Sequence, residues 1–197
     1  IRGLLSYGII ADELDEKGKA ELKTGLDLVD EWDGEANGRL NVALSPHAPY
    51  TCGEDVLRRI AKISEDEGIP IHTHVSETRK EVEDSREEYG LSPVGRLEEL
   101  GVLDKEVLAA HCVHLSDRDV ETLAKRDVVV THNPTSNMKL ASGAAPVKKL
   151  KDAGVKVTLG TDGPGTNNDL DMFGEMRQAS FLSKLREDDP TALSAEE

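Results

Sequence analysis

The stretch Asp127-Val128-Val129-Val130-Thr131-His132 decides the fold, because it is an almost unbroken apolar run that ends in a polar side chain. Strands that are buried on both faces, as in parallel sheets, have near-continuous apolar runs of this kind. An amphipathic pattern typical of a helix follows over Ala145 to Ala153. The stretch therefore predicts one β-α unit, in which a buried strand is followed by a covering helix.

The same unit repeats along the whole chain, since short apolar runs alternate with longer amphipathic ones. We predict strands over residues 4–10, 40–44, 69–75, 107–112, 128–131 and 155–160. We predict helices over residues 19–32, 54–67, 76–89 with 93–100, 117–125, 145–153 and 170–185. This alternation indicates the α/β class, with a parallel sheet covered by helices.

Polar residues at the strand ends favour a barrel over a doubly wound sheet. His47, His74, His111, His132 and Asp162 each lie at or just after the end of a predicted strand. A β/α barrel collects its catalytic groups at this edge of its strands. We therefore expect a β/α barrel, with all 197 residues in one domain.

Composition excludes several classes of partner. The chain has 39 Asp+Glu against 24 Lys+Arg, a formal net charge of −15, which disfavours nucleic acid and anionic membrane surfaces. We find no apolar run long enough to cross a membrane and no signal segment, and we expect a cytoplasmic protein with a small-molecule substrate. Cys52 and Cys112 lack metal-ligand spacing and are predicted to be buried, reduced thiols. The oligomeric state stays open, with a homo-oligomer among the alternatives.

The strongest local pattern is Ile71-His72-Thr73-His74-Val75-Ser76-Glu77. Residues two apart on a strand point the same way, so His72 and His74 share a face, and Glu77 follows on the loop. Histidine and glutamate in this arrangement can bind a metal. The alternative is a pair of hydrogen-bonded core histidines.

Two further strand ends carry residues that are costly to bury alone. Asp162 directly follows an apolar strand and is flanked by glycines, so it is either paired with a cation or metal or acts as a turn aspartate. His111 follows Ala109-Ala110 and must be hydrogen-bonded or metal-linked if it is buried. His114 lies further into the loop and is expected on the solvent side or behind a ligand.

Five motifs together resemble the amidohydrolase superfamily, and within it the branch of 5-methylthioadenosine/S-adenosylhomocysteine deaminases. They are Ser45-Pro46-His47-Ala48-Pro49-Tyr50, His72-Thr73-His74-Val75-Ser76-Glu77-Thr78, Ala109-Ala110-His111-Cys112-Val113-His114-Leu115, His132-Asn133-Pro134-Thr135-Ser136-Asn137-Met138-Lys139-Leu140 and Leu159-Gly160-Thr161-Asp162-Gly163. The resemblance runs over nearly the whole chain, with each motif at a predicted strand end. It implies a metal-dependent hydrolase with a (β/α)8 barrel.

The resemblance also implies a role for each matching residue. One divalent metal ion, with zinc the usual one, is held by His74 and Asp162. His111 orients the reacting water, Glu77 is the acid/base that exchanges protons with the purine ring, and Asp162 takes the proton from water. His47, Glu77 and Arg2 contact the nucleoside substrate. The implied reaction deaminates adenosine derivatives to inosine derivatives and ammonia. Asn133 and Asn137 either shape the pocket or structure their loop.

The chain departs from the family at its ends. The family's first two metal ligands form a His-x-His on the first barrel strand, and no histidine precedes His47. We therefore expect a partial barrel, roughly strands three to eight with their helices, incomplete at both ends. Such a chain is expected to be inactive, or to bind metal very weakly, when isolated.

Three alternatives stay open. The chain could act as a related enzyme, such as a guanine deaminase or a triazine or chlorinated-ring hydrolase, since that machinery is shared. It could be a non-catalytic binding or assembly module that has lost its site. A self-sufficient site of four ligands, His72, His74, His111 and Asp162, is the third alternative, although His72 is expected one layer deeper in the barrel than His74.

Overall fold

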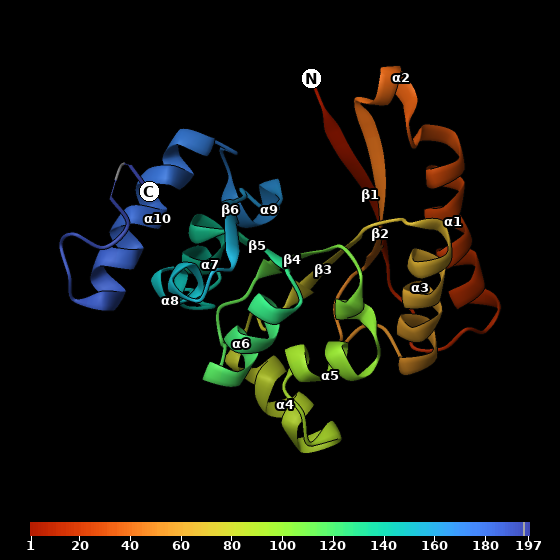
Figure 1. Cartoon of the computed structure of the whole chain (residues 1–197), viewed down its shortest axis with the longest axis horizontal. Helices are drawn as coiled ribbons and strands as arrows, with labels where there is room; N and C mark the ends of the chain where they lie inside the picture. Colours follow the sequence, from red (N-terminus) through yellow and green to blue (C-terminus); the bar gives the residue numbers. More distant parts are fainter. Residues whose placement is uncertain (195) are drawn as a thin grey trace. The chain divides into compact units, whose positions relative to one another are not determined.

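The computed structural model describes residues 1–194 and 196–197. Its strands are β1 (Gly3–Ile9), β2 (Leu40–Pro46), β3 (Ile71–Val75), β4 (Val107–His111), β5 (Val129–His132) and β6 (Lys156–Leu159). They form one sheet in chain order, and the β1–β2, β2–β3 and β5–β6 pairs run parallel (Figure 1). Parallel neighbours in chain order require a crossover after each strand, which the helices provide.

The helices between the strands complete the α/β pattern. They are α1 (Glu16–Trp32), α2 (Glu35–Gly38), α3 (Glu54–Glu67), α4 (Arg79–Tyr89), α5 (Pro93–Glu99), the 3-10 turn η1 (Val102–Asp104), α6 (Asp117–Lys125), α7 (Pro134–Lys139), α8 (Val147–Asp152), α9 (Pro164–Asn167) and α10 (Met172–Glu187). The predicted α/β class is confirmed. The prediction of one domain stays a prediction.

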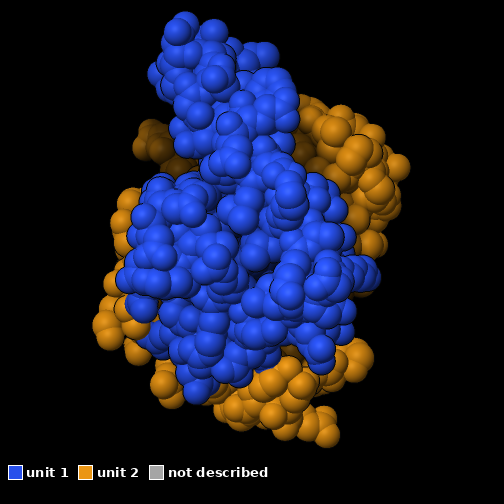
Figure 2. Space-filling model, turned by 90° about the vertical axis from the view of Figure 1, so that its right-hand side faces the viewer, with its two compact units in different colours: residues 1–74, 95–108 blue, residues 75–94, 109–197 orange. Residues whose placement is uncertain are grey.

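The chain divides into two compact units, coloured separately in Figure 2. Unit 1 comprises residues 1–74 and 95–108, and unit 2 comprises residues 75–94 and 109–197. In unit 1, α1 packs on β1 and β2, and α3 packs on β2. The large side chains that are fully buried there are Ile9, Leu44, Leu57, Ile60, Ile71, Leu97 and Leu103. Unit 1 thus has an apolar core between its strands and helices.

Unit 2 buries polar groups beside its apolar ones. Leu123 and Leu150 are fully buried, and Val113, Ala145 and Val147 form a second apolar cluster. The polar or charged side chains buried in the same unit include His111, His132, Ser136, Asn137, Asn167 and Glu175. Buried polar groups are stable only when they are hydrogen-bonded. Unit 2 therefore has to be held together by specific polar contacts as well as by apolar packing.

Local signals account for the elements that were predicted best. Helix α3 has the predicted bounds and stops at Gly68, which is left-handed at φ 71°. Helix α6 also has the predicted bounds, because Ser116 and Asp119 form a capping box at its start. Helix α1 begins three residues earlier than predicted, where the Asp15 side chain accepts from the Gly18 N–H. Helices α7 and α9 were not predicted, since each is too short to show a helical period.

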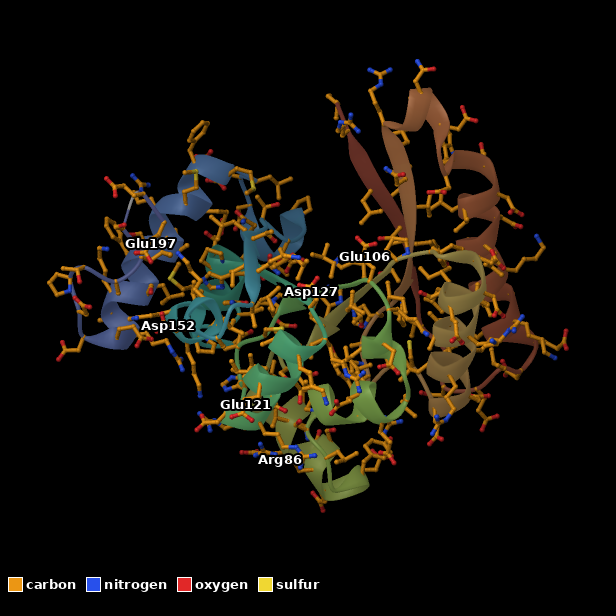
Figure 3. All side chains as sticks on the ribbon, in the orientation of Figure 1. Arg86, Glu106, Glu121, Asp127, Asp152 and Glu197 are labelled. Atoms are coloured by element: carbon orange, nitrogen blue, oxygen red, sulfur yellow. The ribbon has the colours of Figure 1, made fainter. Side chains whose placement is uncertain are left out.

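Exposed charged side chains lie on several helices of the chain. Figure 3 labels six charged side chains from different parts of the chain, among them Glu121 on α6 and Asp152 at the end of α8, and both are exposed. Many lysines pair with an acid one turn away, as Lys23 does with Asp27. Such exposed pairs contribute little to stability. No helix within the described residues is long and apolar enough to span a membrane.

Candidate active site

Two of the predicted site residues, His47 and His74, lie together in unit 1. His47 follows the end of β2, and His74 lies near the end of β3. The His47 carbonyl oxygen accepts from the His74 backbone N–H at 3.0 Å and lies 2.6 Å from His74 Nδ1. The two ring centroids are 4.8 Å apart. Pairing of neighbouring strands therefore brings these two histidines into contact.

This contact decides which ring nitrogen of His74 carries the proton. A carbonyl oxygen can only accept, so Nδ1 is the protonated nitrogen and Nε2 has the lone pair. A histidine that ligates a metal usually has such a partner on its other nitrogen. His72 lies on the same face, with its ring 6.1 Å from that of His74, as the alternation along the strand predicts.

His47 is itself fixed by the turn that follows it. His47 Nδ1 lies 2.9 Å from the Thr51 hydroxyl, and the same hydroxyl contacts the backbone of Ala48. The ring of Tyr50 meets that of His47 edge-on at 6.1 Å. His47 is only half-buried, so its ring combines a fixed orientation with access to a ligand.

Arg2 is not brought to these histidines. The register pairs Gly3 with Leu40 and Ile9 with Pro46, so Arg2 precedes β1 while His47 follows β2. A strand rises about 3.3 Å per residue, which separates the two ends of β1 by roughly 20 Å. Arg2 is also exposed. Within unit 1 the structure thus places it at the opposite strand ends from His47.

Three strand ends in unit 2 turn through left-handed backbone. Ser76, His111 and Asp162 have φ values of 52°, 72° and 59°. This region is uncommon for residues other than glycine, and it costs free energy unless the surroundings enforce it. Here the Ser76 carbonyl accepts from the backbone N–H groups of Val113 and His114 at 3.1 and 2.9 Å. Ser76, His111 and Asp162 thus combine a polar side chain at a strand end with a strained backbone.

Glu77 and His111 meet in unit 2. Glu77 Oε2 lies 3.8 Å from His111 Nε2, and Glu77 Oε1 accepts from the Ser142 hydroxyl at 3.1 Å. His111 is buried, whereas Glu77 is half-buried. The Glu77 carboxyl group therefore has one side held by the protein and retains access to solvent or a ligand. A carboxyl in this position can exchange a proton with a bound molecule.

The backbone before Glu77 is held by a buried carboxyl group, Glu81 on α4. Its two oxygens accept from the N–H groups of Ser76 at 2.8 Å and Glu77 at 2.7 Å. Burial raises the pKa of Glu81 to about 7, although these backbone hydrogen bonds lower it. Glu81 thus fixes the turn that presents Glu77. It was not predicted, because nothing in the sequence separates it from the other acids of α4.

Asp162 is kept ionised by its neighbours. Burial alone would raise its pKa, but hydrogen bonds from Thr166, Ser136 and the Gly163 N–H hold the pKa of Asp162 below its usual value. The Ser136 and Thr166 hydroxyls lie 2.7 and 2.6 Å from Oδ2. These contacts also satisfy the turn interpretation of Asp162, since Gly163 N lies 2.8 Å from Oδ1. The carboxylate is nevertheless half-exposed and negatively charged.

The other predicted residues have structural partners. His132 is buried, and burial followed by repulsion from His111 lowers its pKa to about 4, so it is neutral near pH 7. His114 is half-buried, with Nε2 2.7 Å from the Ser142 carbonyl oxygen. Cys52 and Cys112 are free and buried, as predicted. Burial raises the pKa of the Cys112 thiol, which keeps it protonated.

The donors predicted for a metal are divided between the two units. His72 and His74 belong to unit 1, whereas His111 and Asp162 belong to unit 2. Within residues 1–194 and 196–197, no group of three or more His, Cys, Asp or Glu side chains is arranged to hold a metal ion. The four-ligand alternative therefore gains no support from either unit.

Comparison with known proteins relates this site to a family of hydrolases. The model of the amidohydrolase family matches residues 1–197. The chain is 49% identical over 195 residues to a 5'-deoxyadenosine deaminase of Methanothermobacter thermautotrophicus, covering 99% of this chain and 46% of that protein. It is 48% identical to a 5-methylthioadenosine/S-adenosylhomocysteine deaminase of Desulforudis audaxviator, covering 99% of this chain and 45% of that protein. The chain thus spans less than half the length of these curated relatives.

Solved structures confirm the predicted architecture. A zinc-bound adenosine deaminase of Xanthomonas campestris superposes with a TM-score of 0.90 at 37% identity, over 98% of this chain and 44% of that one. An atrazine chlorohydrolase of Arthrobacter aurescens complexed with zinc gives a TM-score of 0.79 at 26% identity, over 88% of this chain and 38% of that one. The predicted partial (β/α)8 barrel is confirmed by these neighbours. The chain belongs to the amidohydrolase family.

Proposed function

We propose that this chain supplies the later strands of a metal-dependent enzyme that deaminates adenosine derivatives to inosine derivatives and ammonia. The observation that carries the proposal is the Glu77–His111 pair at two adjacent strand ends, 3.8 Å apart. Support comes from relatives named 5'-deoxyadenosine deaminase and 5-methylthioadenosine/S-adenosylhomocysteine deaminase. The substrate class is therefore a small nucleoside with an adenine base.

The side chains that we assign to the metal, His74 and Asp162, are chemically suited to bind one zinc ion. Imidazole nitrogen and carboxylate oxygen are both zinc ligands. His74 Nδ1–H donates to the His47 carbonyl oxygen, and the Asp162 carboxylate is ionised. A bound zinc ion acts as a Lewis acid and makes water a better nucleophile. Catalytic zinc usually has three protein ligands, so we propose that the remaining ones lie outside residues 1–197.

The residues of this chain have separate tasks in the proposed reaction. Glu77 donates a proton to the ring nitrogen next to the amino-bearing carbon of adenine. Water adds to that carbon while Asp162 accepts its proton, and His111 orients the water through a ring nitrogen. The carbon–nitrogen bond then breaks as ammonia leaves with the proton held by Asp162, and the added hydroxyl gives its proton to Glu77 and becomes the carbonyl of the inosine derivative. His47 contacts the nucleoside.

Deaminase activity tests the proposal directly, through the ultraviolet change that accompanies conversion of adenine to hypoxanthine. The substrates are 5'-deoxyadenosine, 5-methylthioadenosine and S-adenosylhomocysteine. Guanine and a chlorinated triazine are tested beside them as substrates of the alternative, related hydrolases. The assay uses zinc-loaded samples of the 197-residue chain and of a longer protein that contains it. We expect the longer protein to deaminate the adenosine derivatives and the chain alone to be inactive.

Variants separate the proposed chemistry from a change in folding. Glu77→Gln is expected to lower kcat in the longer protein by at least about 100-fold, the usual contribution of an acid/base group. Glu83→Gln removes a carboxylate from an exposed position of α4 and should leave kcat unchanged. Conversion of guanine or the triazine without any of the adenosine derivatives would assign the site to a related hydrolase.

A further inference from the structure

The buried amide of Asn137 lies between two histidines of unit 2. Asn137 is on α7, and its exposed fraction is 0%. Its Oδ1 lies 2.9 Å from His111 Nδ1, and its Nδ2 lies 3.5 Å from His132 Nδ1. One side chain therefore contacts the histidines at the ends of both β4 and β5.

An amide imposes a different tautomer on each of these histidines. Its oxygen can only accept, so His111 Nδ1 has to carry a proton, and the lone pair of the neutral ring is on Nε2. Its nitrogen can only donate, so the longer 3.5 Å contact favours a lone pair on His132 Nδ1. The lowered pKa of His132, about 4, agrees with a neutral ring there. His111 Nε2 is the atom that lies 3.8 Å from Glu77.

A second amide competes for His111 and makes the weaker contact. Asn133 Nδ2 lies 3.5 Å from the same His111 Nδ1, and a donor there would require the opposite tautomer. Hydrogen bonds of this type have their optimum near 2.9 Å and weaken with distance. The 2.9 Å contact of Asn137 Oδ1 therefore decides the protonated nitrogen.

The backbone around Asn137 is held on both sides. Its N–H donates to the Asn133 carbonyl at 2.9 Å, and its carbonyl accepts from the Ser142 N–H at 2.8 Å. The Ser142 hydroxyl in turn donates to Glu77. The segment 133–142 thus contacts both members of the Glu77–His111 pair. Such fixed backbone allows an amide to hold one orientation.

We propose that Asn137 is a positioning residue, which holds His111 in the Nδ1–H tautomer and so presents the Nε2 lone pair beside Glu77. The tautomer is a property of unit 2 alone. Its consequence for catalysis rests on the proposed function, in which His111 orients the reacting water through a ring nitrogen.

The test is nitrogen-15 NMR of the histidine rings in the 197-residue chain, labelled on histidine and freed of metal with a chelator. His111→Gln identifies the His111 signals, and His132→Gln those of His132. In the unmodified chain we expect His111 protonated on Nδ1 and His132 on Nε2. The opposite tautomer at His111 would overturn the proposal without any variant of Asn137.

Variants of Asn137 then test whether its side chain sets the tautomer of His111. Asn137→Ala should shift the His111 ring toward the Nε2–H tautomer, whereas Asn137→Asp keeps an acceptor and should retain Nδ1–H. Asn41→Ala, at an exposed position of β2, is the matched control and should change neither ring. A His111 ring that stays fully Nδ1–H in a folded Asn137→Ala chain would contradict the proposal. The Asn137→Asp result still decides if the alanine variant fails to fold, because a switch to Nε2–H there would also contradict it.

Activity gives a separate outcome. In a longer protein with deaminase activity, Asn137→Ala should lower kcat by about 10- to 100-fold with little change in KM, the usual effect of removing a partner behind an active-site histidine. Asn137→Asp should recover part of that loss. Correct tautomers without any deaminase activity would refute the proposed function and leave the tautomer assignment intact.

Discussion

The strand ends of unit 1 and those of unit 2 hold their polar side chains in different ways. In unit 1, His74 Nδ1 lies 2.6 Å from the backbone carbonyl oxygen of His47, the residue after β2. In unit 2, Glu77, His111 and Asp162 are held largely by side chains from the helices and loops that follow the strands. Strand pairing and the turn after β2 therefore orient the first group, whereas the second depends on residues that are distant in sequence.

The backbone conformation at the strand ends also differs between the two units. Ser76, His111 and Asp162 all have positive φ in unit 2. Among the described residues, those with positive φ do not include His47 or His74 of unit 1. Strain of this kind persists only where the surroundings enforce it. We infer that the geometry of the unit 2 residues is more sensitive to substitution of their neighbours.

The largest expected effect concerns Asp162. Asp162→Asn removes the charge but keeps an oxygen that can accept from Ser136 and Thr166, so stability should change little. In a protein with deaminase activity, kcat/KM should fall by at least about 100-fold, because the amide cannot accept the proton from water. Kinetics with 5'-deoxyadenosine and the urea midpoint measure the two quantities.

The matched control is Asp152→Asn, which removes an exposed carboxylate at the end of α8. It should leave both kcat/KM and the urea midpoint unchanged. Near-normal kcat/KM in Asp162→Asn would show that the strand ends of unit 2 do not carry the chemistry, and the contrast between the units would then be structural only.

Substitution of one glycine in each unit should lower the unfolding free energy by different amounts. A Cβ on Gly53 in unit 1 would lie 1.8 Å from the backbone oxygen of Asp12, whereas one on Gly160 in unit 2 would lie 2.4 Å from Asn133 Oδ1 and 2.7 Å from Thr131 Cγ2. Backbone moves less readily than a side chain. We expect Gly53→Ala to cost about 3 kcal/mol of unfolding free energy and Gly160→Ala about 1 kcal/mol, within the range for overpacking.

Urea unfolding of the 197-residue chain measures both variants. Gly165→Ala is the control, since a Cβ there meets nothing within 4 Å. A greater loss of unfolding free energy in Gly160→Ala than in Gly53→Ala would contradict this prediction. It would mean that the amide of Asn133 is held more rigidly than the backbone beside Gly53.

The sequence predicts the elements well where they carry a period or a cap. Helices α3 and α6 have their predicted bounds because Gly68 and the Ser116–Asp119 capping box mark their ends. Helix α7 was missed, since six residues give no period to detect. This omission matters for function, because α7 carries Ser136 and Asn137 to the strand ends.

The site residues were predictable as strand-end polar groups but not as a network. Asn137 and His111 are 26 residues apart, and Ser142 and Glu77 are 65 apart. Contacts over such separations arise from packing, to which local periodicity is blind. Arg2 is a different case: the family resemblance assigns it to the substrate, the strand register places it at the opposite strand ends from His47, and its substrate contact stays a prediction.

A further expected effect is a pH dependence that belongs to Glu81 of unit 2. Its pKa in the folded chain is about 7, above the ordinary value of 4.5, so between these values the folded state binds more protons than the unfolded state. The stabilising contribution of protonated Glu81 is therefore complete below about pH 4.5 and is lost as the pH rises through 7. One proton limits the slope to about 1.4 kcal/mol per pH unit.

Comparison with Glu81→Gln isolates this term, because glutamine does not titrate and all other groups are shared. The unfolding free energy of the unmodified chain, measured in urea from pH 5 to 7, should fall relative to that of the variant as the pH rises. Parallel curves would mean that the N–H groups of Ser76 and Glu77 keep the Glu81 carboxylate ionised despite its burial. The turn before Glu77 would then be held by a charge, and unit 2 would stabilise buried polar groups more strongly than the raised pKa implies.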